Sequence, residues 1–285
     1  MGKLDKVLQK AKIHDLTDVT EEKDSEAKNG DSLDLDKDES NHSDNRSKLE
    51  DNDLRRGPVD FRVVVYHKPE SLPAEHFKVL RGVLMQPNNG RVIKSVLVTS
   101  ALEQEGKTMV SCNLAVSIAQ SIDPYVLLID ADVRRPNVHA MLGLKRSAGL
   151  TDYLLSGKPL SNFLVKGIMD KMTVLQAGSP VRNPAELMTS ERMQGLLHEA
   201  RNRYADRFII IDSPPVNLTA ETLTLAKHVD AIILVVRYGV SDKNAVSDAV
   251  NKLGKNNIFG IVFNGFEVTP RKYTYYKKKY YTTVY

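Results

Sequence analysis

Residues 100–108 combine a loop of small and polar residues with two side chains suited to holding phosphate. The segment reads SALEQEGKT and matches the pattern G-x-x-x-x-G-K-[ST], with Ala101 in place of the first glycine. In such loops backbone N–H groups cradle phosphates, the lysine neutralises phosphate oxygens, and the hydroxyl binds Mg²⁺. The pattern predicts a nucleotide site; an ordinary helix start with an exposed lysine is the alternative. The residues predicted to contact nucleotide are Ala101, Glu105, Gly106, Lys107, Thr108 and Met109, together with Asn264.

Two further apolar runs end in aspartates. YVLLID ends at Asp130 and is followed by Asp132, and RFIIID ends at Asp212. Carboxylate oxygens suit Mg²⁺, and a carboxylate can accept the proton of a hydroxyl. Thr108 and these three aspartates are therefore the predicted magnesium ligands. Taken singly, each aspartate has the alternative role of capping a turn or a helix.

The C-terminus of the chain is rich in tyrosine. Six of the 11 tyrosines lie within residues 273–285, where residues 271–285 also supply five Lys and Arg side chains. The hydroxyls are candidate phosphate acceptors, and each phosphate would add about −1.5 to −2 charges to a cationic segment. Aromatic and basic residues together also bind nucleic acid or membrane surfaces, so those functions are the alternatives.

Strands and helices alternate through the region that carries these motifs. Helices are predicted at 72–86, with Phe77, Leu80, Val83 and Leu84 on one face, and at 107–120. Runs rich in Val, Ile and Leu predict strands at 61–69, 92–100, 125–130, 172–176, 207–212, 231–237 and 258–264. Continuous apolar runs are typical of strands buried on both faces. The predicted fold class is therefore α/β, a doubly wound and mostly parallel sheet flanked by helices.

Charge divides the chain unevenly. The net charge is +4, but residues 1–56 carry 16 acidic and 11 basic side chains, so the rest carries an excess of positive charge. We expect an acidic, disordered N-terminal segment (1–57), a catalytic domain (58–268) and a tyrosine-rich tail (269–285). A short amphipathic helix at 3–16 is either a docking helix or a fraying terminus.

Several classes of protein are excluded by composition. The single cysteine, Cys112, cannot form an intramolecular disulfide or a multi-cysteine metal site, and we expect it to be a small buried residue. No apolar run approaches the length of a membrane span, and the N-terminus lacks a signal-peptide core. These features predict a soluble intracellular protein.

The order of the motifs resembles the bacterial tyrosine autokinases of capsule and exopolysaccharide synthesis. SALEQEGKT, LLIDADVRRP and IIIDSPP resemble the Walker A, A′ and B motifs of that family, and the similarity covers roughly residues 59–285. The resemblance implies a P-loop tyrosine kinase that uses ATP and Mg²⁺, with Lys107, Asp130 and Asp132 catalytic and Asp130 accepting the tyrosine proton. Arg134 or Arg135 contacts phosphate or substrate, or caps the turn, and Asn264 contacts adenine or belongs to a turn. The implied autophosphorylation sites are Tyr273, Tyr275, Tyr276, Tyr280, Tyr281 and Tyr285.

Partners are implied by the same resemblance. The family forms rings through an E-x-x-R-x-x-R motif, which here is Glu75, Lys78 and Arg81, with Lys78 in place of an arginine. Lysine keeps the charge but loses the bidentate fork, and a solvated helix face is the alternative. A separate transmembrane activator (a chain-length determinant), a cognate phosphatase and a cytoplasmic, membrane-peripheral location are expected, and no nucleic-acid partner.

Two other functions compete with the kinase. The first is a nucleotide-switch ATPase of the ParA/MinD type, which has the same fold without tyrosine kinase activity. Those ATPases carry a signature lysine early in the loop, where this chain has Leu102, and they lack a tyrosine tail. The second is a nucleic-acid-binding protein that uses the basic tail, whose binding would be sensitive to salt.

Overall fold

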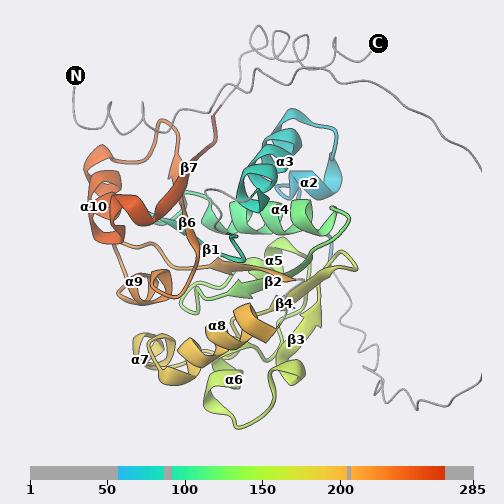
Figure 1. Ribbon diagram of the computed structural model, residues 1–285, viewed down its shortest axis with the longest axis vertical. Coiled ribbons are helices and arrows are strands. Elements are labelled where there is room, and N and C mark those ends of the chain that lie inside the picture. Colours follow the sequence, from blue (N-terminus) through green and yellow to red (C-terminus); the bar gives the residue numbers. More distant parts are fainter. Residues whose placement is uncertain (1–56, 87–91, 204–206, 267–285) are drawn as a thin grey trace, which may run out of the picture. The chain divides into compact units, whose positions relative to one another are not determined.

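The computed structural model describes residues 57–86, 92–203 and 207–266 (Figure 1). The predicted helix at 3–16, the acidic segment and the six tail tyrosines lie outside these ranges. The strands are β1 (Ser95–Ser100), β2 (Tyr125–Asp130), β3 (Leu164–Lys166), β4 (Met172–Leu175), β5 (Arg207–Asp212), β6 (Ala231–Arg237) and β7 (Ile258–Asn264). The helices are α2 (Val64–His67), α3 (Leu72–Met85), α4 (Lys107–Ala119), α5 (Val138–Met141), α6 (Leu150–Leu155), α7 (Pro184–Met188), α8 (Glu191–Arg203), α9 (Glu221–Ala226) and α10 (Lys243–Leu253), with 3₁₀ turns η1 (Leu160–Phe163) and η2 (Lys255–Asn257).

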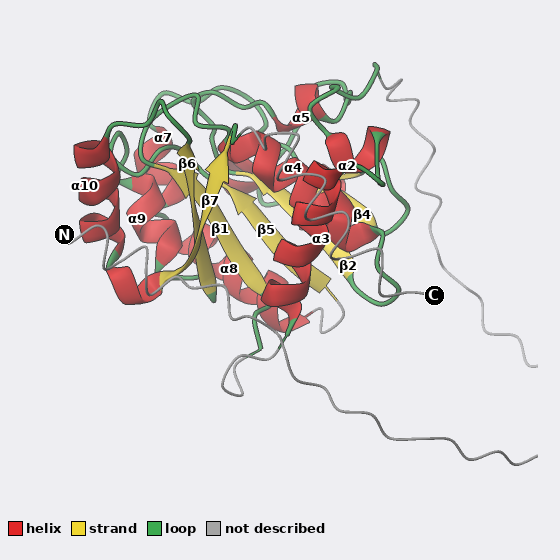
Figure 2. Cartoon of the chain, turned by 90° about the horizontal axis from the view of Figure 1, so that it is seen from above, coloured by secondary structure: helices red, strands yellow, loops and turns green. Residues whose placement is uncertain are grey.

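All of the strands belong to one sheet. Its order is β3-β4-β2-β5-β1-β6-β7, and every pair is parallel except β3 with β4. Helices cover both faces of this sheet (Figures 1 and 2). The predicted doubly wound, mostly parallel α/β fold is confirmed.

The two faces have separate apolar cores, because successive side chains of a strand point to opposite faces. In β1, Val96 and Val98 pack with α2, α3, α4 and α5, whereas Leu97 packs with the helices from α6 to α10. The central strands bury nearly all of their residues, which explains why they read as continuous apolar runs.

Helix α4 is the element that joins the core to the candidate phosphate loop. Its N-cap is Gly106, and most of its residues, Cys112 included, are buried between the sheet and α3. This enclosure explains a helix with no polar face. Burial, followed by the nearby Asp212 charge, raises the pKa of the Cys112 thiol well above its usual range, which keeps the thiol protonated.

The predicted strand at 61–69 is wrong. Val63 and Val65 are buried as an alternating strand would require, but the segment turns into the short helix α2. The backbone of Val65 is satisfied by α4 side chains: its N–H donates to Asn113 Oδ1 (3.0 Å), and its carbonyl accepts from Gln120 Nε2 (3.2 Å). With these partners the segment needs no neighbouring strand.

The structure differs from the predictions in smaller ways at the ends of elements and at the edge of the sheet. The strand predicted from residue 92 begins at Ser95, and Val83 of α3 is half exposed, not buried with Leu84. The antiparallel strand β3 was not predicted, since it has only three residues and lies at the edge of the sheet. Within the described part of the chain, no helix is both long and apolar enough to cross a bilayer.

Candidate nucleotide and catalytic site

The three predicted motifs meet at the carboxyl ends of adjacent strands. β5 lies between β1 and β2, and the sheet register pairs Asp130 at the end of β2 with Asp212 at the end of β5. The loop at 101–106 leaves β1 next to them and leads into α4. This edge is where open parallel sheets bind ligands.

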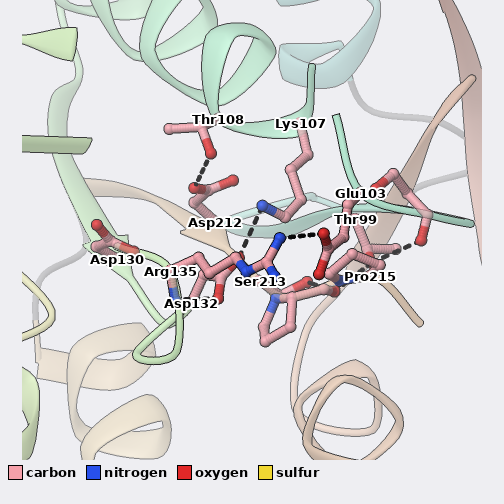
Figure 3. Close-up of polar contacts among 12 residues, drawn as sticks. Thr99, Glu103, Lys107, Thr108, Asp130, Asp132, Arg135, Asp212, Ser213 and Pro215 are labelled. Atoms are coloured by element: carbon pink, nitrogen blue, oxygen red, sulfur yellow. Dashed lines mark hydrogen bonds and ion pairs between the residues drawn. The ribbon is translucent and has the colours of Figure 1, made fainter. Parts of the chain in front are cut away.

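Lys107 bridges the loop and the second motif. Its Nζ atom lies 2.8 Å from Asp132 Oδ2, and both side chains are largely buried (Figure 3). Burial lowers the pKa of Lys107, but the charges of Asp212, Asp132 and Asp130 together outweigh burial and raise it above its ordinary value. Lys107 therefore stays cationic, as a group that neutralises phosphate must.

Asp212 is held by two hydroxyls of α4. Thr108 Oγ1 donates to Asp212 Oδ2 (2.7 Å; Figure 3). Ser111 Oγ donates to Asp212 Oδ1 (3.0 Å). Complete burial raises the pKa of this carboxyl to about 6, against the opposing effects of Lys107 and the Thr108 hydrogen bond. Thr108, whose hydroxyl is predicted to bind Mg²⁺, is thus hydrogen-bonded to Asp212, and we call this pair the Thr108–Asp212 unit.

Asp130 has the most unusual environment of the three aspartates. It is fully buried, its Oδ2 accepts the Val138 N–H (3.1 Å), and its Oδ1 has no hydrogen-bond partner. Burial, and then the Asp212 charge, raise the pKa of this carboxyl well above its usual range. An oxygen without a partner at the end of a buried strand is available to accept a proton or to bind a cation.

Two ion pairs fix the turn that carries Asp132. Arg135 Nη1 pairs with Glu103 Oε2 of the phosphate loop, and Figure 3 shows this pair beside Lys107. Arg134 donates from two nitrogens to the buried Glu221 Oε1, at 3.1 and 2.8 Å. Both arginines are therefore engaged with carboxylates that hold the turn, and their predicted contact with phosphate or substrate stays a prediction.

Four residues predicted to contact nucleotide have other partners in the structure. Ala101 is buried in the apolar core, and Met109 packs against the core on the α4 side. The Glu105 carboxylate bonds to Leu102 N (3.0 Å) and to the Ser241 hydroxyl. Asn264 Nδ2 donates to the carbonyl of Glu105 (2.9 Å). The Glu105 and Asn264 side chains thus hold the loop, and the nucleotide contacts predicted for this segment stay predictions.

The donor set fits a magnesium ion that arrives with a phosphate. In the described ranges no three His, Cys, Asp or Glu side chains form a cage for a metal. Mg²⁺ in phosphoryl-transfer sites takes only one or two carboxylates and completes its shell with phosphates and water. Asp130 Oδ1, with no partner, and the Thr108–Asp212 unit supply donors of that kind.

The predicted oligomerisation motif is engaged within the chain. Lys78 Nζ pairs with Glu75 Oε1 one turn earlier (2.6 Å), and Arg81 Nη1 donates to the Ser117 carbonyl of α4 (2.5 Å). Arg81 is thus an internal tether between α3 and α4.

Sequence reasoning missed Ser111, Glu221 and Ser241. Ser111 was within reach, because it follows Thr108 by three residues and so lies on the same helix face. Nothing local marks Glu221 or Ser241, whose partners lie far away in the sequence.

Comparison with known proteins places the chain in a family. A family model described as ParA, NUBPL iron-transfer P-loop NTPase, matches residues 91–272. Tyrosine-protein kinase YwqD of Bacillus subtilis (strain 168) is 34% identical over 228 residues, covering 79% of this chain and 95% of YwqD. The chain belongs to the bacterial tyrosine-kinase family.

Other members of this bacterial tyrosine-kinase family agree in sequence and in structure. Tyrosine-protein kinase CpsD of Streptococcus pneumoniae serotype 4 is 32% identical over 191 residues, covering 65% of this chain and 82% of CpsD. The solved kinase domain of the Escherichia coli tyrosine kinase ETK superposes with a TM-score of 0.65 at 27% identity, covering 78% of this chain and 87% of that domain. The family predicted from the motifs is confirmed.

Proposed function

We propose that this tyrosine kinase phosphorylates the tyrosines of its own C-terminal tail, or those of a neighbouring copy, with ATP as donor. The observation that carries the proposal is the convergence of Lys107, Thr108 and three buried aspartates at one edge of the sheet. Phosphoryl transfer needs mainly positioned positive charge, a metal and a base, and these residues supply the groups for each.

Each side chain has a role that follows from its surroundings. Lys107, kept cationic by three carboxylates, neutralises the phosphate oxygens. Thr108 and Asp212 would hold Mg²⁺, which would supply further positive charge at the phosphates. Asp132 orients Lys107 through their ion pair.

Asp130 is the proposed general base. Its Oδ1 takes the proton of the tyrosine hydroxyl while the phenolic oxygen forms its bond to phosphorus and ADP leaves. A raised pKa makes the ionised carboxylate a stronger base, and the nearby Lys107 charge favours that ionised form. The free Oδ1 supports the assignment, since it can accept a proton without losing an existing hydrogen bond.

The acceptor and the regulation are proposed from the tail. Tyr273, Tyr275, Tyr276, Tyr280, Tyr281 and Tyr285 are interspersed with basic residues. Several phosphates would turn the tail from cationic to anionic. We propose that this change switches assembly between copies of the chain and the contact with a transmembrane activator, and that a phosphatase reverses it. Control of capsule or exopolysaccharide synthesis from the inner face of the membrane belongs to the same proposal.

The competing function is a switch ATPase, favoured by the match to the ParA family model. The structure offers an argument against it. Leu102, at the position of the signature lysine, packs against the apolar core, and Glu105 holds its N–H. Because residue 102 is an uncharged leucine that packs against the core, this chain has no second lysine at that position.

The test is autophosphorylation of the purified chain with Mg²⁺ and ATP, with phosphotyrosine measured by mass spectrometry. Wild type should acquire phosphotyrosine only in the tail, Lys107→Met should acquire none, and removal of residues 271–285 should abolish the signal without abolishing nucleotide binding. ATP hydrolysis without phosphotyrosine, even with a membrane activator present, would favour the switch ATPase.

A further inference from the structure

The turn after β6 lies against the phosphate loop. Residues 237–241 form a closed turn, in which Ser241 N donates to the Arg237 carbonyl (3.0 Å) and Arg237 N donates to Ser241 Oγ (2.8 Å). The same two side chains then reach residues 104 and 105, more than 130 positions earlier in the chain. The turn is thus both internally fixed and bonded to the loop.

Glu105 is the buried partner of the Ser241 hydroxyl. Only 4% of this residue is exposed, and each carboxylate oxygen has one partner: Oε2 accepts from Leu102 N, and Oε1 accepts from the Ser241 hydroxyl. Loss of the Ser241 hydroxyl would leave a buried carboxylate oxygen without a partner, which a loop can avoid only by moving.

Gln104, the partner of Arg237, has a strained backbone. Its φ of 60° makes it the one non-glycine residue with a left-handed backbone among those that the structure describes. Arg237 Nη1 donates to its carbonyl (3.2 Å). Such a conformation persists only where neighbouring groups hold it.

We propose that Ser241 and Arg237 are positioning residues for the phosphate loop. They keep residues 104 and 105 in the form in which the N–H groups that follow can receive phosphate. Neither residue is assigned a contact with phosphate, metal or tyrosine. The inference rests on the proposed nucleotide site, since it says what holds that site in shape.

The expected effect on affinity follows from the fraction of molecules in which the phosphate loop has the shape that binds nucleotide. When only a fraction of the molecules has the competent loop, the apparent Kd rises by the inverse of that fraction. Ser241→Ala removes a hydrogen bond to a buried charged group, and we expect Mg²⁺·ADP to bind about tenfold more weakly. The KM for ATP should rise by a similar factor with little change in kcat.

Calorimetric titration of Mg²⁺·ADP into the full chain tests this, with Ser241→Thr, which keeps the hydroxyl, as the rescuing variant. Ser161→Ala, an exposed serine before the opposite edge strand, is the control. Affinity should fall in Ser241→Ala and remain near that of wild type in the other two. An unchanged Kd with a lowered melting temperature would overturn the proposal, because that result describes a purely structural serine.

A double-mutant cycle tests the contact between Arg237 and Gln104. If Arg237 holds the strained residue, Arg237→Ala should weaken binding several-fold in wild type, but less in a Gln104→Gly background, where the left-handed conformation carries no steric cost. Equal losses in the two backgrounds would refute this part. A wild type that binds no nucleotide contradicts the proposed function instead, so the two failures are distinguishable.

Discussion

Replacing Asp212 by asparagine should stabilise the ligand-free protein even as it removes kinase activity. Asp212 is fully buried beside two other carboxylates, and burial raises its pKa from 3.8 to about 6. Asparagine has nearly the same shape, and its amide can still bond to the Thr108 and Ser111 hydroxyls. The substitution therefore removes a buried charge and leaves the hydrogen bonds largely in place.

The magnitude follows from the pKa. A rise from 3.8 to about 6 corresponds to on the order of 3 kcal/mol against the ionised folded state at neutral pH. This value already includes the attraction to Lys107. Because an amide matches the two hydroxyl hydrogen bonds less well than the carboxyl group does, we expect a net gain of roughly 1–2 kcal/mol, or about 4 °C in melting temperature. Because the folded pKa lies above the unfolded one, the gain should be absent below about pH 4 and should grow as the pH rises to about 6.

Thermal unfolding of the metal-free protein followed by circular dichroism, from about pH 4 to about pH 8, measures this difference. Asp60→Asn is the control, since Arg62 lowers the pKa of Asp60 to about 2. The ionised Asp60 carboxylate stabilises the wild type until the pH falls towards that pKa. Asp60→Asn should therefore be less stable than wild type by almost the same amount across the upper part of the pH range. A destabilised Asp212→Asn at neutral pH, or a pH-independent difference, would refute the reasoning.

The remaining predictions concern nucleotide, loop and assembly. Lys107→Met should reduce phosphotyrosine formation at least about 100-fold in a single-turnover assay, since it removes the cation that faces the phosphates; retention of more than a tenth of the rate would contradict that role. Gly106→Ala should abolish detectable Mg²⁺·ADP binding in calorimetry, because its φ is 96° and a Cβ there would lie 2.0 Å from Asn264 Nδ2; near-normal affinity would show that the loop tolerates another shape. Light scattering should show a large oligomer before autophosphorylation and a smaller species afterwards, and an unchanging monomer in both states would exclude this form of regulation.

The central strands, and the fact that the candidate site residues lie together, could be predicted from the sequence. Tyr125–Asp130 and Arg207–Asp212 were predicted to the residue, because each apolar run ends abruptly at an aspartate where the strand leaves the core. Parallel strands bring such ends to one edge, so the grouping of the aspartates with Lys107 followed from topology alone.

The partners of these residues were not predictable in the same way. Asn113 accepts a hydrogen bond from the backbone of Val65 in α2, and the Ser241 hydroxyl donates to Glu105 from another part of the chain. Both interactions depend on how elements pack, and neither has a local signal. The hydrogen bond from the Asn264 amide to the Glu105 carbonyl has no local signal either, and the adenine contact expected of Asn264 stays a prediction.

The most direct test of the kinase account is the intact mass of the chain after incubation with Mg²⁺ and ATP, followed by peptide mapping. The account predicts added phosphates that map to the tyrosines of residues 273–285, and none on the Asp130→Asn protein, whose buried base is gone. Phosphate on other residues only, or equal phosphorylation of wild type and Asp130→Asn, would contradict it.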